Sequence, residues 1–297
     1  MLNQIKKDKL DVLCEKYRFL AVENPEAIKE LTLAEIPEQV YNSNAIENST
    51  LTLEDTEDIL LRDQIRTDHE VREIYEAKNL AKATNYLLGN PREPLTIDLI
   101  LTLHKLLLTD INDSVAGRFR SGHEWVRVGS HIGANPEFVF RQMAELIDDY
   151  HYHQKQADRY FLENIAYFHG QFELIHPFCD GNGRIGRLLT NRQLQRLGLP
   201  PIIIRSKTKV RDYYLHLHNF ETMNSPEGLE NMFYLALSEA LNRRIATLTS
   251  ERIIPLSDWA KANHVDEQSA SNRAARQTLP AFHVRDKWMI SENTKPE

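Results

Sequence analysis

The chain has 297 residues, of which 41% are hydrophobic and 27% charged, a composition typical of a globular protein. Its net charge of −7 argues against a general binder of nucleic-acid phosphates, and two widely separated cysteines exclude a disulfide framework. Charged residues interrupt the N-terminal segment, which is therefore unlike a signal peptide or a membrane helix, and we expect a cytoplasmic protein.

Apolar residues recur every three or four positions through most of the chain, which is the spacing of amphipathic helices. Thr52 followed by Asp55 has the spacing of a helix-capping box. Gly198, with prolines after it, predicts the end of a helix. The pattern predicts an all-α fold with helices over 5–21, 70–88, 97–108, 136–150, 160–175, 184–197 and 227–249.

The clearest strand signal lies between two of these helices. Residues 124–128 read EWVRV and are flanked by Ser121-Gly122 on one side and by Gly129 and Gly133 on the other. Alternating apolar residues between turn residues predict a short hairpin or an extended flap.

The pattern changes from about residue 251 onward. Ser257 and Asp266 are suited to cap two short helices, and the segments AFHV and KWMI, separated by Arg285-Asp286, predict a hairpin. This order resembles the winged helix-turn-helix of excisionase-like proteins. Residues 251–297 carry seven basic and seven acidic side chains, so the sequence leaves DNA binding, target docking and a subunit contact open.

The chemically richest stretch is IHPFCDGNGRIGR, residues 175–187. Pro177 disfavours helical geometry at His176, so the preceding helix is expected to end there. The segment Gly181-Asn182-Gly183 permits backbone N–H groups to converge on an anion. Phe178 is expected to turn inward and anchor the loop.

A helix that begins near Arg184 would turn its positive end toward that loop. Arg184 and Arg187 are three positions apart, on one helix face, and guanidinium groups bind phosphate well. Asp180 suits the Mg²⁺ that accompanies nucleotide phosphates. His176 is the residue of the loop whose ordinary pKa lies near neutrality, which suits a general base.

These residues resemble the signature of the Fic family, His-x-Phe-x-(Asp/Glu)-Gly-Asn-Gly-Arg-x-x-Arg, at every fixed position. The resemblance extends over about residues 90–225 and includes Gly117-Arg118-Phe119-Arg120. It implies a Fic helical core with a β-hairpin flap. It also implies an enzyme that transfers AMP from Mg·ATP to a Ser, Thr or Tyr hydroxyl of a protein.

The resemblance assigns a role to each matched residue. His176 would deprotonate the target hydroxyl, and Asp180 would hold Mg²⁺. Gly181, Asn182 and Gly183 would form the anion hole. Family members that phosphorylate carry Lys at the position of Gly183, so glycine here favours AMP transfer.

The two arginines and the flap complete the implied site. Arg184 would bind the β- and γ-phosphates and stabilise the departing pyrophosphate, while Arg187 would contact the γ-phosphate. The target would dock against the flap through Trp125, Val126, Arg127 and Val128, and ordinary packing of Trp125 and Val128 stays open as the alternative.

A second motif lies near the N-terminus, in residues 42–50, NSNAIENST. Taken alone it reads as an ordinary helix end. Beside the Fic motif, Ser43, Glu47 and Asn48 resemble the family's inhibitory helix, (Ser/Thr)-x-x-x-Glu-(Gly/Asn). The resemblance implies that Glu47 pairs with Arg187 in the space of the γ-phosphate and restrains the enzyme.

The sequence thus predicts four regions: an N-terminal helical region with the inhibitory helix near 40–50, the Fic core, a connecting helix and a winged-helix tail, over residues 1–90, 91–225, 226–250 and 251–297. De-adenylylation, transfer of another nucleotide, and a nucleotide-sensing DNA-binding regulator stay open as alternatives. The target protein, self-modification and formation of a homodimer are left open as well.

Overall fold

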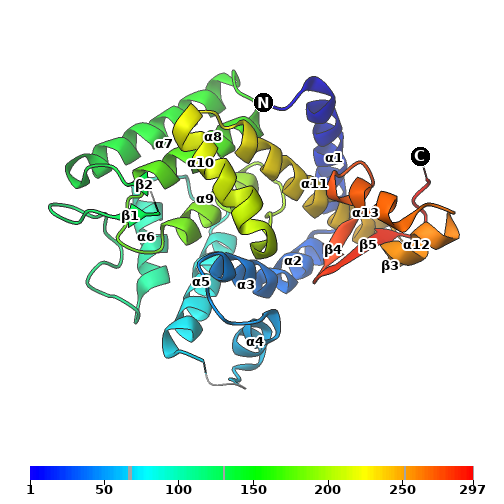
Figure 1. The fold of residues 1–297 in the computed structure, drawn as a ribbon, viewed down its shortest axis with the longest axis horizontal. Helices are drawn as coiled ribbons and strands as arrows, with labels where there is room; N and C mark the ends of the chain where they lie inside the picture. Colours follow the sequence, from blue (N-terminus) through cyan, green and yellow to red (C-terminus); the bar gives the residue numbers. More distant parts are fainter. Residues whose placement is uncertain (66–68, 130, 251, 297) are drawn as a thin grey trace. The chain divides into compact units, whose positions relative to one another are not determined.

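The computed structural model describes residues 1–297 except residues 66–68, Ser130, Glu251 and Glu297 (Figure 1). It contains two compact units, and neither is one continuous stretch of chain. The first consists of Met1, Ile36–Leu197 and Ile203–Glu230, and the second of Leu2–Glu35, Gly198–Ile202 and Asn231–Glu297.

The first unit is helical. Its core is the stack of α7, α8 and α9, in which α8 packs against both neighbours. Buried Phe168, Phe172 and Leu189 fill this stack. The helical segments are α3 (Ile36–Ile46), α4 (Leu53–Glu57), η1 (Asp58–Arg62), α5 (Val71–Gly89), α6 (Ile97–Leu108), η2 (Pro136–Phe138), α7 (Val139–Gln156), α8 (Phe161–Ile175), α9 (Asn182–Arg196), η3 (Ser206–Thr208), η4 (Lys209–Tyr214) and α10 (Leu215–Met223).

The predicted all-α fold is confirmed, and most helix boundaries lie within a few residues of the predicted ones. The capping box is present, since Thr52 Oγ1 accepts from the Asp55 N–H at 3.1 Å and Asp55 accepts from the Thr52 N–H at 3.0 Å. The helix that it starts is short, because a wider turn follows and Asp63 closes it in the left-handed region.

The flap is a hairpin, as predicted, but its strands are shorter than expected. β1 (Arg127–Val128) pairs antiparallel with β2 (His131–Ile132), with Val128 opposite His131. Glu124 is not in a strand, because its carboxylate accepts from the Ser121 N–H at 2.8 Å and pairs with Arg118. Those bonds fold the chain into a turn where the sequence pattern predicts an extended segment.

The second unit combines segments from the N-terminal and C-terminal parts of the chain. Its elements are α1 (Gln4–Glu23), α2 (Pro25–Ala34), most of α11 (Glu227–Thr249), β3 (Ile253–Pro255), α12 (Leu256–Ala262), α13 (Glu267–Ala275), β4 (Phe282–Val284) and β5 (Lys287–Ser291). The strands form an antiparallel sheet in the order β3-β5-β4. Fully buried Trp259 lies in the core of this segment, with Leu256, Ala270 and Ile290.

Two capping predictions in this unit have different outcomes. Asp266 caps α13, since it accepts from the Ser269 N–H at 2.8 Å. The prediction that Ser257 caps a helix is wrong. α12 begins at Leu256, directly after β3, and Pro255 is the residue at its N-cap position. β3 itself is three residues long and carries no alternating pattern, so periodicity did not predict it.

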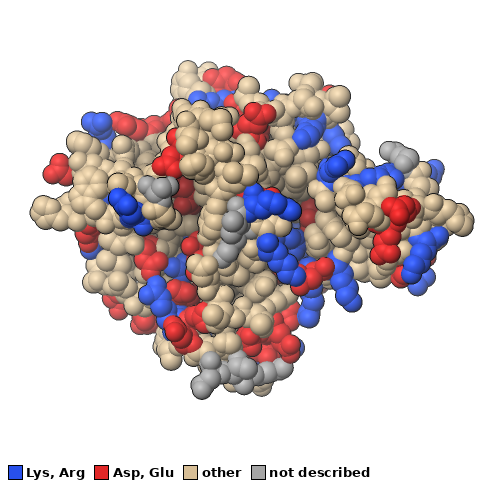
Figure 2. Space-filling view, in the orientation of Figure 1, with Lys and Arg blue, Asp and Glu red and all other residues tan. Residues whose placement is uncertain are grey.

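Within the described residues, every helix is too short or too polar to cross a membrane. Lys and Arg side chains lie among Asp and Glu side chains over the face shown in Figure 2. This mixture agrees with the modest negative charge of the sequence.

Candidate active site

The motif loop begins where α8 ends. His176 adopts left-handed backbone angles, φ 52° and ψ 63°, and its N–H closes the last turn on the Phe172 carbonyl. Buried Arg120 donates to the carbonyls of Ile175 at 2.9 Å and His176 at 2.6 Å. Arg120 therefore caps α8 and fixes the backbone of His176, a function that the sequence pattern did not reveal.

The His176 ring is held in one tautomer. Its Nδ1 lies 3.3 Å from the Glu173 carbonyl oxygen, which can only accept, so Nδ1 carries the proton and Nε2 keeps its lone pair. Burial lowers the pKa of His176 to about 4, and the bond to Glu173 opposes this shift only in part. The imidazole is therefore neutral near pH 7, as a proton acceptor must be.

The loop is anchored from below by an aromatic stack. Phe178 is fully buried, as predicted, and stacks on His104 with ring centroids 3.7 Å apart. His104 accepts from the Gly117 N–H at 3.1 Å, so its other nitrogen donates to the Asp180 carbonyl at 3.1 Å. Burial lowers the pKa of His104 to about 4, which keeps this bridge neutral.

The glycine turn starts α9 two residues earlier than predicted, at Asn182. Gly181 has φ +82°, a conformation that glycine adopts without strain, and it is the N-cap residue of the helix. The Asn182 side chain locks the turn by bonding the N–H and the carbonyl of Phe178, both at 2.8 Å. The first N–H groups of α9 have no partner within the helix, which makes this turn suitable for an anion.

Asp180 and Arg184 form an ionic cluster with α5. Asp180 accepts from Arg72 at 2.6 Å and from Arg184 at 3.0 Å, and Arg184 lies 3.1 Å from Glu76. Burial would raise the pKa of Asp180, but the two guanidinium groups outweigh it and hold the pKa below its ordinary value. Arg72 and Glu76 are distant in sequence from the motif, so no local pattern pointed to them.

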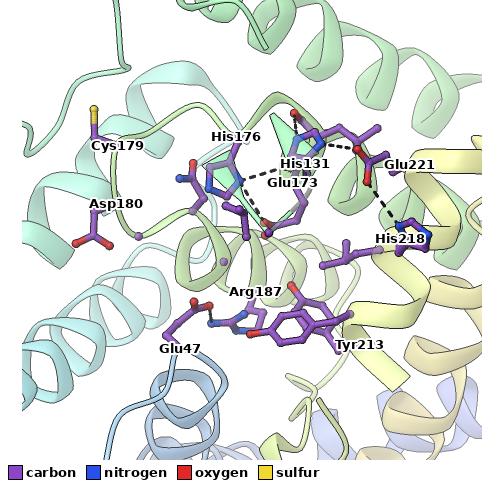
Figure 3. Close-up of a pocket in the computed structure, with 18 residues that line it drawn as sticks. Glu47, His131, Glu173, His176, Cys179, Asp180, Arg187, Tyr213, His218 and Glu221 are labelled. Atoms are coloured by element: carbon purple, nitrogen blue, oxygen red, sulfur yellow. Dashed lines mark hydrogen bonds and ion pairs between the residues drawn. The ribbon is translucent and has the colours of Figure 1, made fainter. Parts of the chain in front are cut away.

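Arg187 faces the N-terminal motif. Its guanidinium donates to Glu47 Oε1 at 2.8 Å (Figure 3). It also donates to the Ser43 carbonyl at 2.9 Å and to Ser43 Oγ at 3.0 Å. The Tyr213 ring lies 5.7 Å from the guanidinium carbon. Burial would raise the pKa of Glu47, but the charge and hydrogen bond of Arg187 hold it below its ordinary value.

Local structure explains how the N-terminal motif reaches this place. Ser43 lies on α3, Glu47 follows its last residue, and Asn48 turns the chain with φ 70°. Asn is one of the few residues that tolerate this left-handed conformation. A side chain at Gly183 would collide with the Glu47 carboxylate, so the glycine leaves space for it.

The two motifs meet in one pocket of about 560 Å³ within the first unit (Figure 3). Arg184, which was expected to point into this space, is not among the lining residues, because it is turned toward Glu76 and Asp180. The site residues that line it are Glu47, His176, Asp180, Gly181, Asn182, Gly183, Arg187 and, from the flap, Val128.

The flap contributes a residue that the sequence reasoning missed. His131 of β2 bonds the Leu174 carbonyl at 2.9 Å and Glu221 at 2.8 Å, and its ring centroid is 6.5 Å from that of His176. Trp125, predicted as a docking residue, is 56% exposed and does not line the pocket. Val126 and Arg127 also lie outside the lining.

Comparisons with known proteins all point to one protein family for the part of the chain that contains this pocket. The Fic/DOC family model matches residues 94–194. Protein adenylyltransferase Fic of Nematostella vectensis is 34% identical over 223 residues, which are 74% of this chain and 50% of that protein. The chain thus spans about half the length of this relative.

Solved structures give the same result. A Fic domain-containing signaling protein from Bacteroides thetaiotaomicron matches with a TM-score of 0.72 and 25% identity over 80% of this chain and 96% of that chain. Residues 134–508 of Fic-1 from C. elegans match with a TM-score of 0.66 and 26% identity, over 80% of this chain and 71% of that one. Sequence motif, fold and relatives agree, and residues 94–194 of this chain are a Fic/DOC family domain.

Proposed function

We propose that this protein transfers AMP from Mg·ATP to a Ser, Thr or Tyr hydroxyl of a protein. The observation that carries the proposal is one pocket in which a neutral histidine, a glycine turn at a helix start and a buried arginine converge. Relatives named protein adenylyltransferase support the reaction type.

In this proposal His176 is the base. Its Nε2 takes the proton of the target hydroxyl while the oxygen bonds to the α-phosphorus, and the bond to the β-phosphate oxygen breaks with its electron pair leaving on pyrophosphate. The turn of Gly181, Asn182 and Gly183 holds phosphate oxygens, and Arg187 neutralises the leaving group. Arg184 joins Arg187 in this role after it turns from Glu76 and Asp180 toward the pocket. Such transfers need positioning and charge neutralisation more than covalent help.

Asp180 is the proposed ligand of Mg²⁺. In the described part of the chain, no group of three or more His, Cys, Asp or Glu side chains is arranged to hold a metal ion alone. The single Asp180 carboxylate therefore fits Mg²⁺ only together with nucleotide phosphates and water, a ligand set that this ion commonly takes. Bound there, Mg²⁺ would neutralise phosphate charge.

We propose further that Glu47 restrains this activity. Its carboxylate and Ser43 occupy the Arg187 donors that the γ-phosphate would need. Glu47 also lines the nucleotide pocket itself. ATP and Glu47 would therefore compete for one guanidinium.

The test is labelling of protein with α-³²P-ATP or γ-³²P-ATP, combined with intact-mass measurement. We expect label to be transferred from the α-position only. Glu47→Gly should raise the labelling rate about 5- to 150-fold, the change that a usual coupling free energy produces. The double variant Glu47→Gly/His176→Ala should lose about 10²–10⁴-fold of that rate. Labelling from the γ-position, or equal rates for Glu47→Gly and wild type, would contradict the proposal.

De-adenylylation is a second candidate for the same site, and one observation favours it. The Glu47 carboxylate lines the pocket that also holds His176, and 37% of its side chain is exposed, so it can orient a water molecule. Incubation of an AMP-modified protein with wild type and Glu47→Gln separates the cases. Release of AMP by wild type alone supports a hydrolytic role.

We also infer that residues 251–297 form a winged-helix-like module. Support comes from the two helices α12 and α13, followed by the hairpin β4-β5 with β3 at its edge. The seven basic and seven acidic side chains of this segment balance, which favours docking of a target protein over binding of DNA, and target docking is the role that we assign to it. Deletion of the module should then lower labelling of the target without lowering self-labelling.

A further inference from the structure

A buried carboxyl group lies beside His176 and has no role in the reaction described above. Glu173 is on α8, one turn before His176, and its side chain is only 11% exposed. Its Oε2 lies 4.0 Å from His176 Nδ1, and its Oε1 has no hydrogen-bond partner (Figure 3). A buried carboxyl without a full set of partners is costly, so its presence asks for an explanation.

The surrounding helices leave space for this group. Gly186 of α9 packs directly on Glu173 Oε1, and any side chain at 186 would collide with it. The same carboxyl lines the pocket with His176 and Arg187. Residues of α8 and α9 together therefore fix the position of the Glu173 carboxyl, which faces His176 Nδ1 rather than the reactive Nε2.

We propose that Glu173 is a positioning residue for His176: as a carboxylate it holds the Nδ1–H side of the ring and balances the charge that appears when Nε2 takes the target's proton. The inference rests on the proposed AMP transfer. In that step the hydroxyl proton moves to Nε2, the ring becomes an imidazolium, and its Nδ1–H stays in place. A negative charge about 4 Å away favours this change far more in a buried site than in water.

The charges around Glu173 set when it ionises. Burial raises the pKa of Glu173 to about 8, Arg187 of α9 opposes the rise, and Glu47 after α3 adds to it. On its own helix, His169 is neutral, since burial lowers its pKa to about 3. Tyr213 and Tyr214 are neutral, because burial raises the pKa of both phenols. Glu173 therefore gives up its proton as pH rises toward about 8, and the base is assisted above that pH.

The experiment measures kcat/KM for AMP transfer between about pH 6 and 9 in the Glu47→Gly background, because kcat/KM reports groups of the free enzyme. With Glu173 intact we expect the rate to rise with pH, with a midpoint below 8 because the Glu47 charge is gone. Glu173→Gln should lower the rate at the alkaline end by about tenfold or more and flatten the profile. Glu173→Asp, which restores the charge, should restore the rise in part.

Glu163→Gln, on the first turn of the same helix and outside the pocket, is the matched control and should change neither rate nor profile. Thermal unfolding of each variant shows whether it is folded. If Glu173→Gln keeps the alkaline rise, or Glu173→Asp behaves as Glu173→Gln, the inference is wrong although AMP transfer stands. If the Glu47→Gly enzyme transfers no AMP at any pH, the proposed function itself fails.

Discussion

At the scale of single residues, Arg187 is a buried arginine whose hydrogen-bond donors are only partly satisfied. It is 7% exposed and donates to Glu47 and Ser43, yet its Nη1 has no hydrogen-bond partner in the described chain. A buried guanidinium N–H without an acceptor is unfavourable. A γ-phosphate, with more acceptor oxygens than one carboxylate, would satisfy it better.

The Glu47–Arg187 contact should be insensitive to mild acid. Because Arg187 lowers the pKa of Glu47, the carboxylate form and its contact persist above the ordinary value of 4.5 and are lost only as pH falls through the lower, folded-state value. Measured in the Glu173→Gln background, where Glu173 does not titrate, the ratio of labelling with and without Glu47→Gly should therefore be constant from about pH 8 to pH 6. A ratio that already collapses near pH 6 would contradict this reading.

The sequence identified residues whose roles are set by their neighbours in the chain. Phe178, Asn182 and Gly181 act within one loop, so their chemistry could be read locally. Arg120 and Arg72 act on residues far away in the sequence, on the end of α8 and on Asp180, and no local pattern reveals either contact. Glu173 looked like an ordinary helical residue because nothing local reveals the space at Gly186.

At the scale of elements, the close approach of α8 and α9 shapes the pocket. The glycine at 186 brings α9 near His169 and Phe172 as well as Glu173. His169 is itself held between Tyr213 and Thr190, at 2.9 and 3.0 Å, so this layer cannot relax easily. Packing here should be sensitive to one added methyl group.

Gly186→Ala should therefore destabilise the protein although alanine is the better helix former. Alanine gains about 0.5–1 kcal/mol in a helix, whereas overpacking a core costs about 1–3 kcal/mol. We expect a lower unfolding temperature and less AMP transfer. Gly89→Ala, at the end of α5, is the control and should leave stability unchanged or raised, because an added Cβ there would meet no atom within 4 Å beyond its chain neighbours and its own helix backbone.

Elements with a clear period could be predicted and those without one could not. The 3.6-residue pattern located α8 and α11 closely, whereas the expected strand over 124–128 was shortened by the Arg118–Glu124 pair. The short π-helices η1 and η4 have no repeating pattern of apolar residues that would predict them. At residues 124–128, side-chain bonds rather than strand propensity decide the local structure.

At the scale of the whole molecule, the second unit is assembled from distant segments. Buried Asn242 of α11 donates to the Gln277 side chain at 2.9 Å, and Lys9 of α1 donates to the Gln277 carbonyl at 2.8 Å. His283 of β4 bonds Glu239 of α11 at 3.0 Å. The C-terminal segment has a core of its own but is also tied to α1 and α11.

Deletion of residues 251–297 should therefore lower the thermal unfolding temperature of the remaining chain, because these buried polar partners are lost. Asn242→Ala tests the link alone and should cost about 1–3 kcal/mol by leaving the Gln277 oxygen unpaired. Calorimetry or circular dichroism measures both. An unchanged unfolding temperature on deletion would show that the segment is an independent appendage.

The contact of Glu47 with Arg187 joins positions 140 residues apart within one folded unit. In the proposed restraint, the Glu47 carboxylate is a tethered ligand, and its effective concentration is set by the packing of α3 rather than by the amount of protein. Dilution should leave the restraint unchanged, whereas the supply of ATP should overcome it. The restraint would then respond to nucleotide level at any protein concentration.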